Sequence, residues 1–206
     1  MGMVFTVGHS THSLEHFMGL LKQHDVAAIA DVRSKPYSRM NPQFNRDDLK
    51  KTLGERGISY VFLGKELGAR SEDKACYHAG KVQYGLLART ELFSRGLERV
   101  QEGARKYRIA LMCAEKDPLE CHRTILVARH LSALGLEVQH IHGDGRLESH
   151  ADVMSRLVRQ LHLPERDMFR ARDEIVAEAY RLQEERIAYS FSEGAPGPRA
   201  AKSGAP

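Results

Sequence analysis

The stretch Ile109-Ala-Leu-Met-Cys-Ala-Glu-Lys-Asp-Pro-Leu-Glu-Cys-His-Arg123 joins an apolar run to a cluster of reactive side chains. The run at its start has the composition of a β-strand, and the residues that follow Arg123 have helical spacing. Two thiols, a carboxylate, an imidazole and a guanidinium therefore gather where a strand ends and a helix begins. In a parallel α/β sheet, this is the place where ligands bind.

Four more apolar runs have the length and composition of strands: residues 4–7, 26–32, 58–63 and 138–141. The run 26–32 does not alternate with polar residues, as is typical of a parallel strand covered on both faces. Apolar residues at helical spacing lie between the strands, most clearly in Leu14, Phe17, Met18 and Leu21 after the candidate N-cap Ser13. This alternation predicts an α/β protein with right-handed crossovers and a doubly wound, mainly parallel, Rossmann-like sheet of about five strands.

The predicted organisation is a single α/β domain over residues 1–163, a C-terminal helical extension over 164–192 and a disordered tail over 193–206. The extension carries a helical stripe of Ile175, Ala179, Leu182 and Arg186, which we expect to pack on the body or to form a homodimer. Gly, Ala, Pro and Ser dominate the tail. The connection 64–89 is either a functional flap or holds a short helix.

Composition excludes several classes of protein. The chain has 206 residues, of which 42% are hydrophobic and 28% charged, and no apolar run approaches the roughly 20 residues that span a bilayer. The first residues lack a cationic region and a long apolar core, so we expect no signal peptide and no membrane partner. Three cysteines argue against a disulfide framework and indicate a reducing compartment, so the expected location is cytoplasmic.

Polar residues follow the predicted strands. The first strand ends at His9 and Ser10, and the second ends at Asp31 and Arg33 before a Pro-containing loop with Arg39. A separate polar group follows the last strand, with His140, His142, Asp144 and His150. Because parallel strands share one polarity, we expect these ends to converge on one edge of the sheet.

These motifs resemble a known family. The combination consists of Gly8-His-Ser10, Asp31-Val-Arg-Ser34, Asn41-Pro-Gln-Phe-Asn45, Cys113-Ala-Glu115 and Cys121-His-Arg123, in that order. It is similar to the family known as domain of unknown function 488, over roughly residues 4–161. The resemblance implies a compact α/β fold. It supplies no activity, so the chemistry has to be argued from residue types.

Thiol catalysis is one interpretation of the cluster. Cys121 lies at the predicted start of a helix, where unpaired N–H groups and the positive side chains of His122 and Arg123 lower the pKa of a thiol. The candidate catalytic residues are Cys121, Cys113, His9, Asp31 and Glu115. The alternative is that Cys113 only packs and that Asp31 forms an internal ion pair. The spacing of the thiols to Arg123 fits neither a rhodanese loop nor a phosphatase loop.

Anion binding is the interpretation that the arginines favour. Guanidinium groups and helix N–H groups suit phosphate or carboxylate. The candidate ligand-binding residues are Ser10, Arg33, Arg39, His122 and Arg123. The net charge of +4 is compatible with a small anionic ligand or with nucleic acid.

Metal binding is a third interpretation, since Cys113, Cys121, His122 and His9 offer soft ligands. Structural zinc usually has a Cys-x₂-Cys knuckle, and the spacing here is Cys-x₇-Cys. The sequence therefore predicts no metal, and it identifies no cofactor.

Two functions follow from the sequence. The first is an enzyme that acts on a phosphate-bearing small molecule, a nucleotide or a modified nucleic-acid component, at the C-terminal edge of the sheet. The second is a non-catalytic module that senses a nucleotide or binds nucleic acid, with structural cysteines. The sequence does not decide whether the protein is an enzyme.

Overall fold

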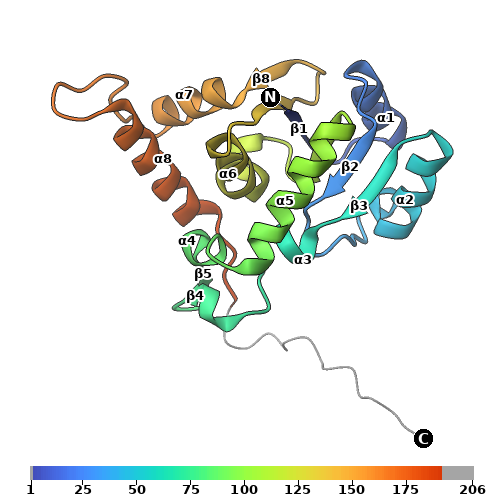
Figure 1. Ribbon diagram of the computed structural model, residues 1–206, viewed down its shortest axis with the longest axis horizontal. Coiled ribbons are helices and arrows are strands. Elements are labelled where there is room, and N and C mark those ends of the chain that lie inside the picture. The colour runs from blue at the N-terminus through green and yellow to red at the C-terminus, as the bar shows by residue number, and fades with distance from the viewer. Residues whose placement is uncertain (1, 192–206) are drawn as a thin grey trace, which may run out of the picture.

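A six-stranded sheet in the order β3-β2-β6-β1-β7-β8 forms the centre of the molecule (Figure 1). The computed structural model describes residues 2–191. The strands are β1 (Met3–Gly8), β2 (Ala28–Asp31), β3 (Ser59–Phe62), β6 (Ile109–Cys113), β7 (Glu137–Ile141) and β8 (Leu147–Ser149). The first five run parallel and are the five strands predicted from the sequence, whereas β8 pairs antiparallel with β7.

Helices cover both faces of this sheet, because successive residues of its central strands point to opposite faces and nearly all of them are apolar. Phe5 of β1 belongs to one core with α1 (Leu14–Gln23) and α2 (Arg46–Glu55). Val4 belongs to the core on the opposite face, which three helices and a π-helical turn cover: α5 (Glu91–Lys106), η4 (Arg123–Ala128), α6 (Arg129–Ala133) and α7 (His150–Gln160). The doubly wound, mainly parallel α/β architecture is therefore confirmed.

Local sequence signals set the helix starts. Ser13 caps α1 by accepting a hydrogen bond from the His16 N–H at 3.1 Å, as predicted. Thr90 caps α5 in the same way, with 3.2 Å between its hydroxyl and the Phe93 nitrogen. Each cap satisfies a backbone donor that the first helical turn leaves free.

The order of the strands places a crevice on each side of β6. The chain leaves β1 and β2, the two neighbours of β6, toward α1 and α2 on one face of the sheet. It leaves β6 toward η4 and α6 on the other face. Where neighbouring strands send their connections to opposite faces, the loops diverge and leave room for a ligand. In this fold the carboxyl end of β6 has such a place on both sides.

The connection 64–89 contains regular structure that the sequence did not locate. It holds two four-residue helices, α3 (Gly64–Leu67) and α4 (Tyr84–Leu87), the 3₁₀ turn η2 (Lys74–Cys76), and a hairpin of β4 (Tyr77–His78) and β5 (Lys81–Val82).

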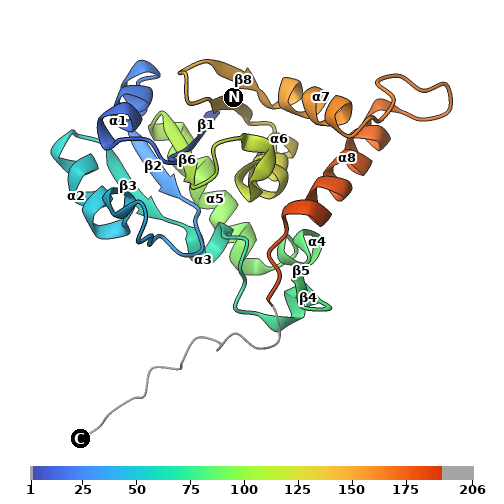
Figure 2. The same cartoon turned by 180° about the vertical axis from the view of Figure 1, so that it is seen from behind.

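The C-terminal helix α8 (Arg172–Ile187) packs on α7 of its own chain, and its far end lies beside α4 and the hairpin in both ribbon views (Figures 1 and 2). Its buried residues are Ile175, Ala179, Tyr180 and Gln183, so the buried side is rotated from the predicted stripe at Leu182 and Arg186. Residues 188–191 then run along the hairpin, where the Val82 N–H donates to the Tyr189 carbonyl at 2.9 Å. The predicted tail 193–206 lies outside the described residues.

Among residues 2–191, no helix combines the length and the apolar character needed to cross a membrane.

Candidate functional site

Two sulfurs, a carboxylate and an imidazole meet at the end of β6. The Sγ atoms of Cys113 and Cys121 lie 3.0 and 2.9 Å from the same oxygen, Oε2 of Glu115. Nδ1 of His122 lies 3.7 Å from the Cys113 sulfur and 3.8 Å from the Cys121 sulfur. Both thiols are almost fully buried, whereas Glu115 is an exposed residue. Glu115 therefore connects the buried sulfurs with water.

The backbone fixes the orientation of the imidazole. Nε2 of His122 donates to the Val32 carbonyl at 3.0 Å, because a carbonyl oxygen only accepts. The other ring nitrogen is thereby turned toward the two sulfurs. A carbonyl that orients a histidine in this way also sets which nitrogen is available for chemistry.

The two thiols differ in acidity. Burial opposes ionisation of Cys121, but the Cys113 thiol beside it and the positive charges of Arg123 and His122 outweigh burial and lower the pKa of Cys121. The contact with Cys121, together with burial, raises the pKa of Cys113. Desolvation and the nearby Cys121 sulfur raise the pKa of Glu115. The arrangement thus favours one thiolate, one thiol and a carboxyl group that readily holds a proton.

Arg33 is held in a fixed position by buried partners. Its guanidinium donates to both oxygens of Asp31, at 2.9 and 2.7 Å, and to the Phe44 carbonyl at 2.8 Å. The Tyr60 hydroxyl donates to the same carboxylate at 2.7 Å. Asp31 is fully buried and all its contacts are internal, so it orients Arg33 in the manner of an internal ion pair.

His9 supports the other side of Arg33. Its Nδ1 donates to the Ser10 carbonyl at 2.8 Å, and its Nε2 accepts from Arg33 at 3.1 Å. Burial and the neighbouring Arg33 charge lower the pKa of His9 to about 4. Its ring stacks on Phe44 with 4.4 Å between the centroids. Ser10 has a left-handed backbone with φ of 48°, a conformation that non-glycine residues adopt only when their surroundings hold it.

Arg123 is fully buried and binds the loop that carries Glu115. Its guanidinium donates to the Glu115 carbonyl at 2.8 Å and to the Lys116 carbonyl at 3.4 Å. Gly8 of β1 lies directly against this loop, and a Cβ atom there would come within 1.9 Å of the Glu115 carbonyl oxygen. The glycine of the first motif is therefore needed for the close approach of loop and strand.

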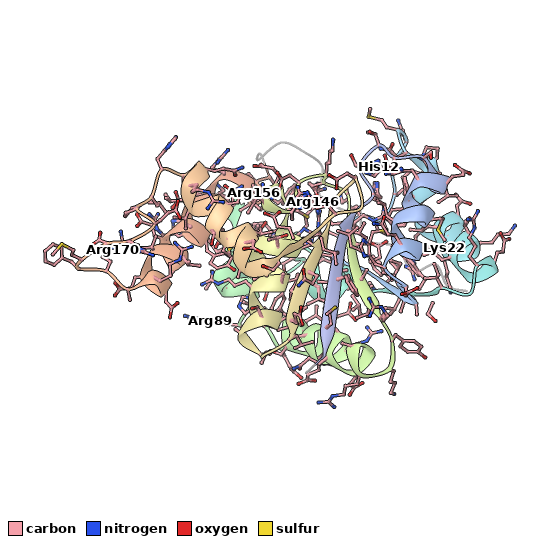
Figure 3. All side chains as sticks on the ribbon, turned by 90° about the horizontal axis from the view of Figure 1, so that it is seen from above. His12, Lys22, Arg89, Arg146, Arg156 and Arg170 are labelled. Carbon is pink, nitrogen blue, oxygen red and sulfur yellow. The ribbon has the colours of Figure 1, made fainter. Side chains whose placement is uncertain are left out.

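The loop is also tied to α7. Arg156, labelled in Figure 3, donates to both oxygens of Asp117 at 3.0 and 3.1 Å and to Glu148 on β8 at 3.0 Å. From the α8 side, Gln183 donates to the Leu119 carbonyl at 2.9 Å. These contacts hold the segment between the two cysteines from two further elements.

Two clefts flank β6, as the strand order leads one to expect. The first, of about 220 Å³, lies toward β2 and is lined by Arg33, Cys113, Glu115 and His122, among others. The second, of about 330 Å³, lies toward β1 and is lined by His9, Ser10, Arg33 and Glu115, among others. Arg33, Lys35 and Glu115 border both clefts, so two cations and one carboxylate lie between the two spaces.

The structure does not bring every candidate residue to these clefts. Arg39 is exposed and borders neither of them, and Arg123 and Cys121 lie beneath the surface. Other residues border them instead: Lys35, Arg70, Tyr84, Lys116 and Tyr189. Tyr84 and Arg70 come from the connection 64–89, and Tyr189 comes from the segment after α8. The sequence marked the connection 64–89 only as a possible functional flap, and it gave no signal for the segment after α8.

The second histidine group forms a separate buried chain. Nδ1 of His140 lies 2.8 Å from the Thr6 hydroxyl, its Nε2 lies 3.1 Å from His150, and His150 lies 2.7 Å from the Tyr180 hydroxyl. This chain runs from β1 through β7 and α7 to α8. It links the C-terminal helix to the sheet. Asp144 accepts from the Arg146 N–H at 3.0 Å, as a turn residue does.

Comparison with known proteins gave one match. Residues 13–130, more than half of the chain, match the family described as domain of unknown function DUF488. The matched range contains both cysteines of the site and Arg33, but not β1, β7 or the C-terminal helix. Searches of curated proteins and of solved structures found no match. The thiol cluster at the end of β6 thus lies within the part of the chain that the family defines, and the protein belongs to the DUF488 family.

Proposed function

We propose that this protein is an enzyme that acts on a phosphate-bearing small molecule, such as a nucleotide or a modified nucleic-acid component, through thiol chemistry. One observation carries the proposal: Cys113 lines a cleft that Arg33, Lys35 and Arg70 also line. A sulfur nucleophile beside clustered cations suits an anionic substrate that carries an electrophilic centre.

The cations supply the binding part of the proposal. Arg33 presents a guanidinium whose position Asp31 and His9 fix, and a group held in advance loses little entropy when it binds. Lys35 borders both clefts, and Lys116 borders the second. Arg123 is not available to the substrate, because its buried guanidinium binds the loop that carries Glu115. We therefore assign Arg33, Lys35 and Arg70 to the phosphate.

The sulfurs and the carboxylate supply the chemistry. In the proposed step, the Cys113 sulfur forms a bond to the electrophilic centre of the substrate, and its proton passes to Glu115 Oε2 at 3.0 Å. The bond from that centre to its leaving group breaks, and Glu115 returns the proton to the leaving group. His122, whose Nδ1 lies 3.7 Å from the Cys113 sulfur, stabilises the negative charge that develops at this sulfur.

Alkylation mapped by mass spectrometry tests the proposal. We expect iodoacetamide to modify Cys113 of the reduced, chelator-treated protein faster than Cys76, which is equally buried but borders neither cleft. Nucleotides or sugar phosphates should protect Cys113. The Arg70→Ala variant should lose this protection, whereas Lys50→Ala, on the exposed side of α2, should keep it.

Two results would contradict the proposal. If Cys113 reacts no faster than Cys76 and no phosphate compound protects it, the cleft is not a site of thiol chemistry. If phosphate compounds bind but neither wild type nor the Cys113→Ser variant converts them, the alternative of a non-catalytic sensing module is supported.

A further inference from the structure

We infer that Cys113, Cys121 and His122 form a binding site for a thiophilic divalent metal ion of the Zn²⁺ class, and that an ion bound there closes the two sulfurs to other reactants. This inference goes beyond the proposed function, because it assigns a second ligand, a cation, to the floor of the same cleft. It rests on the geometry of the three donors.

The spacing of the donor atoms fits tetrahedral coordination. The two Sγ atoms and Nδ1 of His122 all lie within 4.8 Å of one another. In a tetrahedral zinc site with ordinary Zn–S and Zn–N bonds, neighbouring sulfur and nitrogen ligands are about 3.6 Å apart. The corresponding distances here are 3.7 Å for Cys113 and 3.8 Å for Cys121. The donors therefore already stand close to the positions that a central ion requires.

The hydrogen bonds that the surrounding backbone makes with these donors are also typical of a metal site. Metal-binding histidines almost always donate their second ring nitrogen to a carbonyl or carboxylate, which fixes the ring. His122 makes such a bond to the Val32 carbonyl at 3.0 Å. In addition, the backbone N–H of Arg123 points at the Cys121 sulfur at 3.4 Å. Backbone donors of this kind stabilise a thiolate ligand.

Binding balances in charge and protons. Each ion displaces any proton that the two sulfurs still hold, and Glu115 can pass it to water because Glu115 contacts both sulfurs and is an exposed residue. Two thiolates neutralise a divalent cation. With three protein ligands, a tetrahedral zinc ion keeps a fourth coordination position for another ligand. Since Cys113 and His122 both border the first cleft, we expect water or an anion from that cleft to occupy it.

The sequence offered these residues as soft ligands but argued against a metal, because seven residues separate the cysteines. The fold removes that separation. The loop after β6 turns back under the control of Arg123 and Arg156, so that Cys121 returns to the end of the strand that carries Cys113.

Titration of the reduced, metal-free protein with Co²⁺ tests the inference. Tetrahedral Co²⁺ with thiolate ligands shows intense sulfur-to-metal charge-transfer absorption and visible d–d bands, and we expect both to saturate at one ion per chain. Zn²⁺ should displace the Co²⁺ and remove the absorption. Bound Zn²⁺ should also protect Cys113 and Cys121, but not Cys76, from iodoacetamide.

Variants decide whether these three residues hold the ion. Cys113→Ser and Cys121→Ser should each weaken binding by more than about 100-fold, since loss of an outer contact alone gives about 10–100-fold. Cys76→Ser should bind as wild type does. His122→Gln, with folding checked by circular dichroism, should lose affinity while both thiols remain. A Co²⁺ spectrum without charge-transfer bands, or one that Cys113→Ser and Cys121→Ser leave unchanged, would overturn the inference.

The outcome is separable from that of the proposed function. The alkylation and protection experiment uses chelator-treated protein and phosphate compounds, whereas the titration uses metal ions alone. Each can succeed or fail without the other.

Discussion

Gly8 is the residue whose replacement should disturb the site most directly. A Cβ atom at this position would lie 1.9 Å from the Glu115 carbonyl oxygen, which is a backbone atom and cannot turn aside as a flexible side chain can. We expect Gly8→Ala to lower the free energy of unfolding by about 1–3 kcal/mol or more, as overpacking does, and to raise the reactivity of both thiols. Urea denaturation and alkylation rates measure the two effects.

The matched control for this prediction is Gly19→Ala. Gly19 lies on the exposed side of α1, and nothing lies within 4 Å of a Cβ added there. Alanine is the better helix former by about 1 kcal/mol, so this variant should be as stable as wild type or more so. Equal destabilisation by the two substitutions would contradict the role given to Gly8.

Asp31 gives a second prediction at the scale of single residues. Asp31→Ala leaves the Arg33 guanidinium buried without its counter-ion, so we expect a loss of about 3–5 kcal/mol in chemical denaturation. The exposed pair Arg95–Glu91 is the control, since Glu91→Ala should change stability by less than about 1 kcal/mol. A loss below that of the control would show that Arg33 does not depend on Asp31.

At the scale of elements, the strands and helices that have a clear pattern of apolar residues could be predicted from the sequence. All five parallel strands were predicted, because long apolar runs such as that ending at Asp31 stand out when both faces are buried. The strand β8 was missed because it has only three residues, of which two are half-buried and one is exposed. The helices α3 and α4 have four residues each, about one helical turn, so their sequences contain no repeated helical period to detect.

The candidate site also has one part that could be predicted from the sequence and one part that could not. The motif at the end of β6 could be predicted, because strand polarity alone places Cys113 and Glu115 at the ligand-binding edge. Tyr84 and Tyr189 could not be predicted, because the short helix α4 and the segment after α8 carry no sequence pattern that places them beside the cleft. The meeting of the two sulfurs also depends on tertiary contacts, the buried bonds of Arg123, which no local pattern reveals.

The segment after α8 gives a prediction at this scale. The Tyr189 ring borders the first cleft and lies under the Arg70 guanidinium at 4.4 Å from its centroid. Tyr189→Ala should release Arg70, so we expect phosphate compounds to bind about 2–5-fold more weakly, which corresponds to about 0.5–1 kcal/mol. Cys113 should be alkylated faster. Tyr107→Ala, at an exposed site after α5, is the control, and the same change in both variants would argue against a role for this segment.

At the scale of the whole molecule, the buried chain of His140, His150 and Tyr180 makes stability depend on pH. Burial lowers the pKa of His150 to about 4, and burial together with the charges of His150, Arg123, His142 and Arg156 lowers that of His140 well below its usual value. In the unfolded chain both titrate near 6.5. Between these values the unfolded state binds more protons, so acid favours unfolding.

We therefore expect full stability above pH 6.5 and a progressive loss as the pH falls toward 4. Each histidine contributes up to about 1.4 kcal/mol per pH unit. Urea denaturation at several pH values measures the slope. The variant His150→Gln, which keeps a polar partner for Tyr180, should show a flatter slope than wild type. An unchanged slope would mean that this chain is not the origin of the acid sensitivity.

The walls of the first cleft come from two stretches of very different character. The reactive sulfurs belong to the range 13–130 that defines the family, whereas Tyr189 and Ile187 reach the cleft from beyond it. The entrance of the first cleft therefore depends on a carboxy-terminal arm that lies outside the range matched by the family. A shortened form of this chain that ends before α8 would keep both sulfurs, but it would lose one side of the cleft's entrance and the Gln183 contact that holds the loop between the two cysteines.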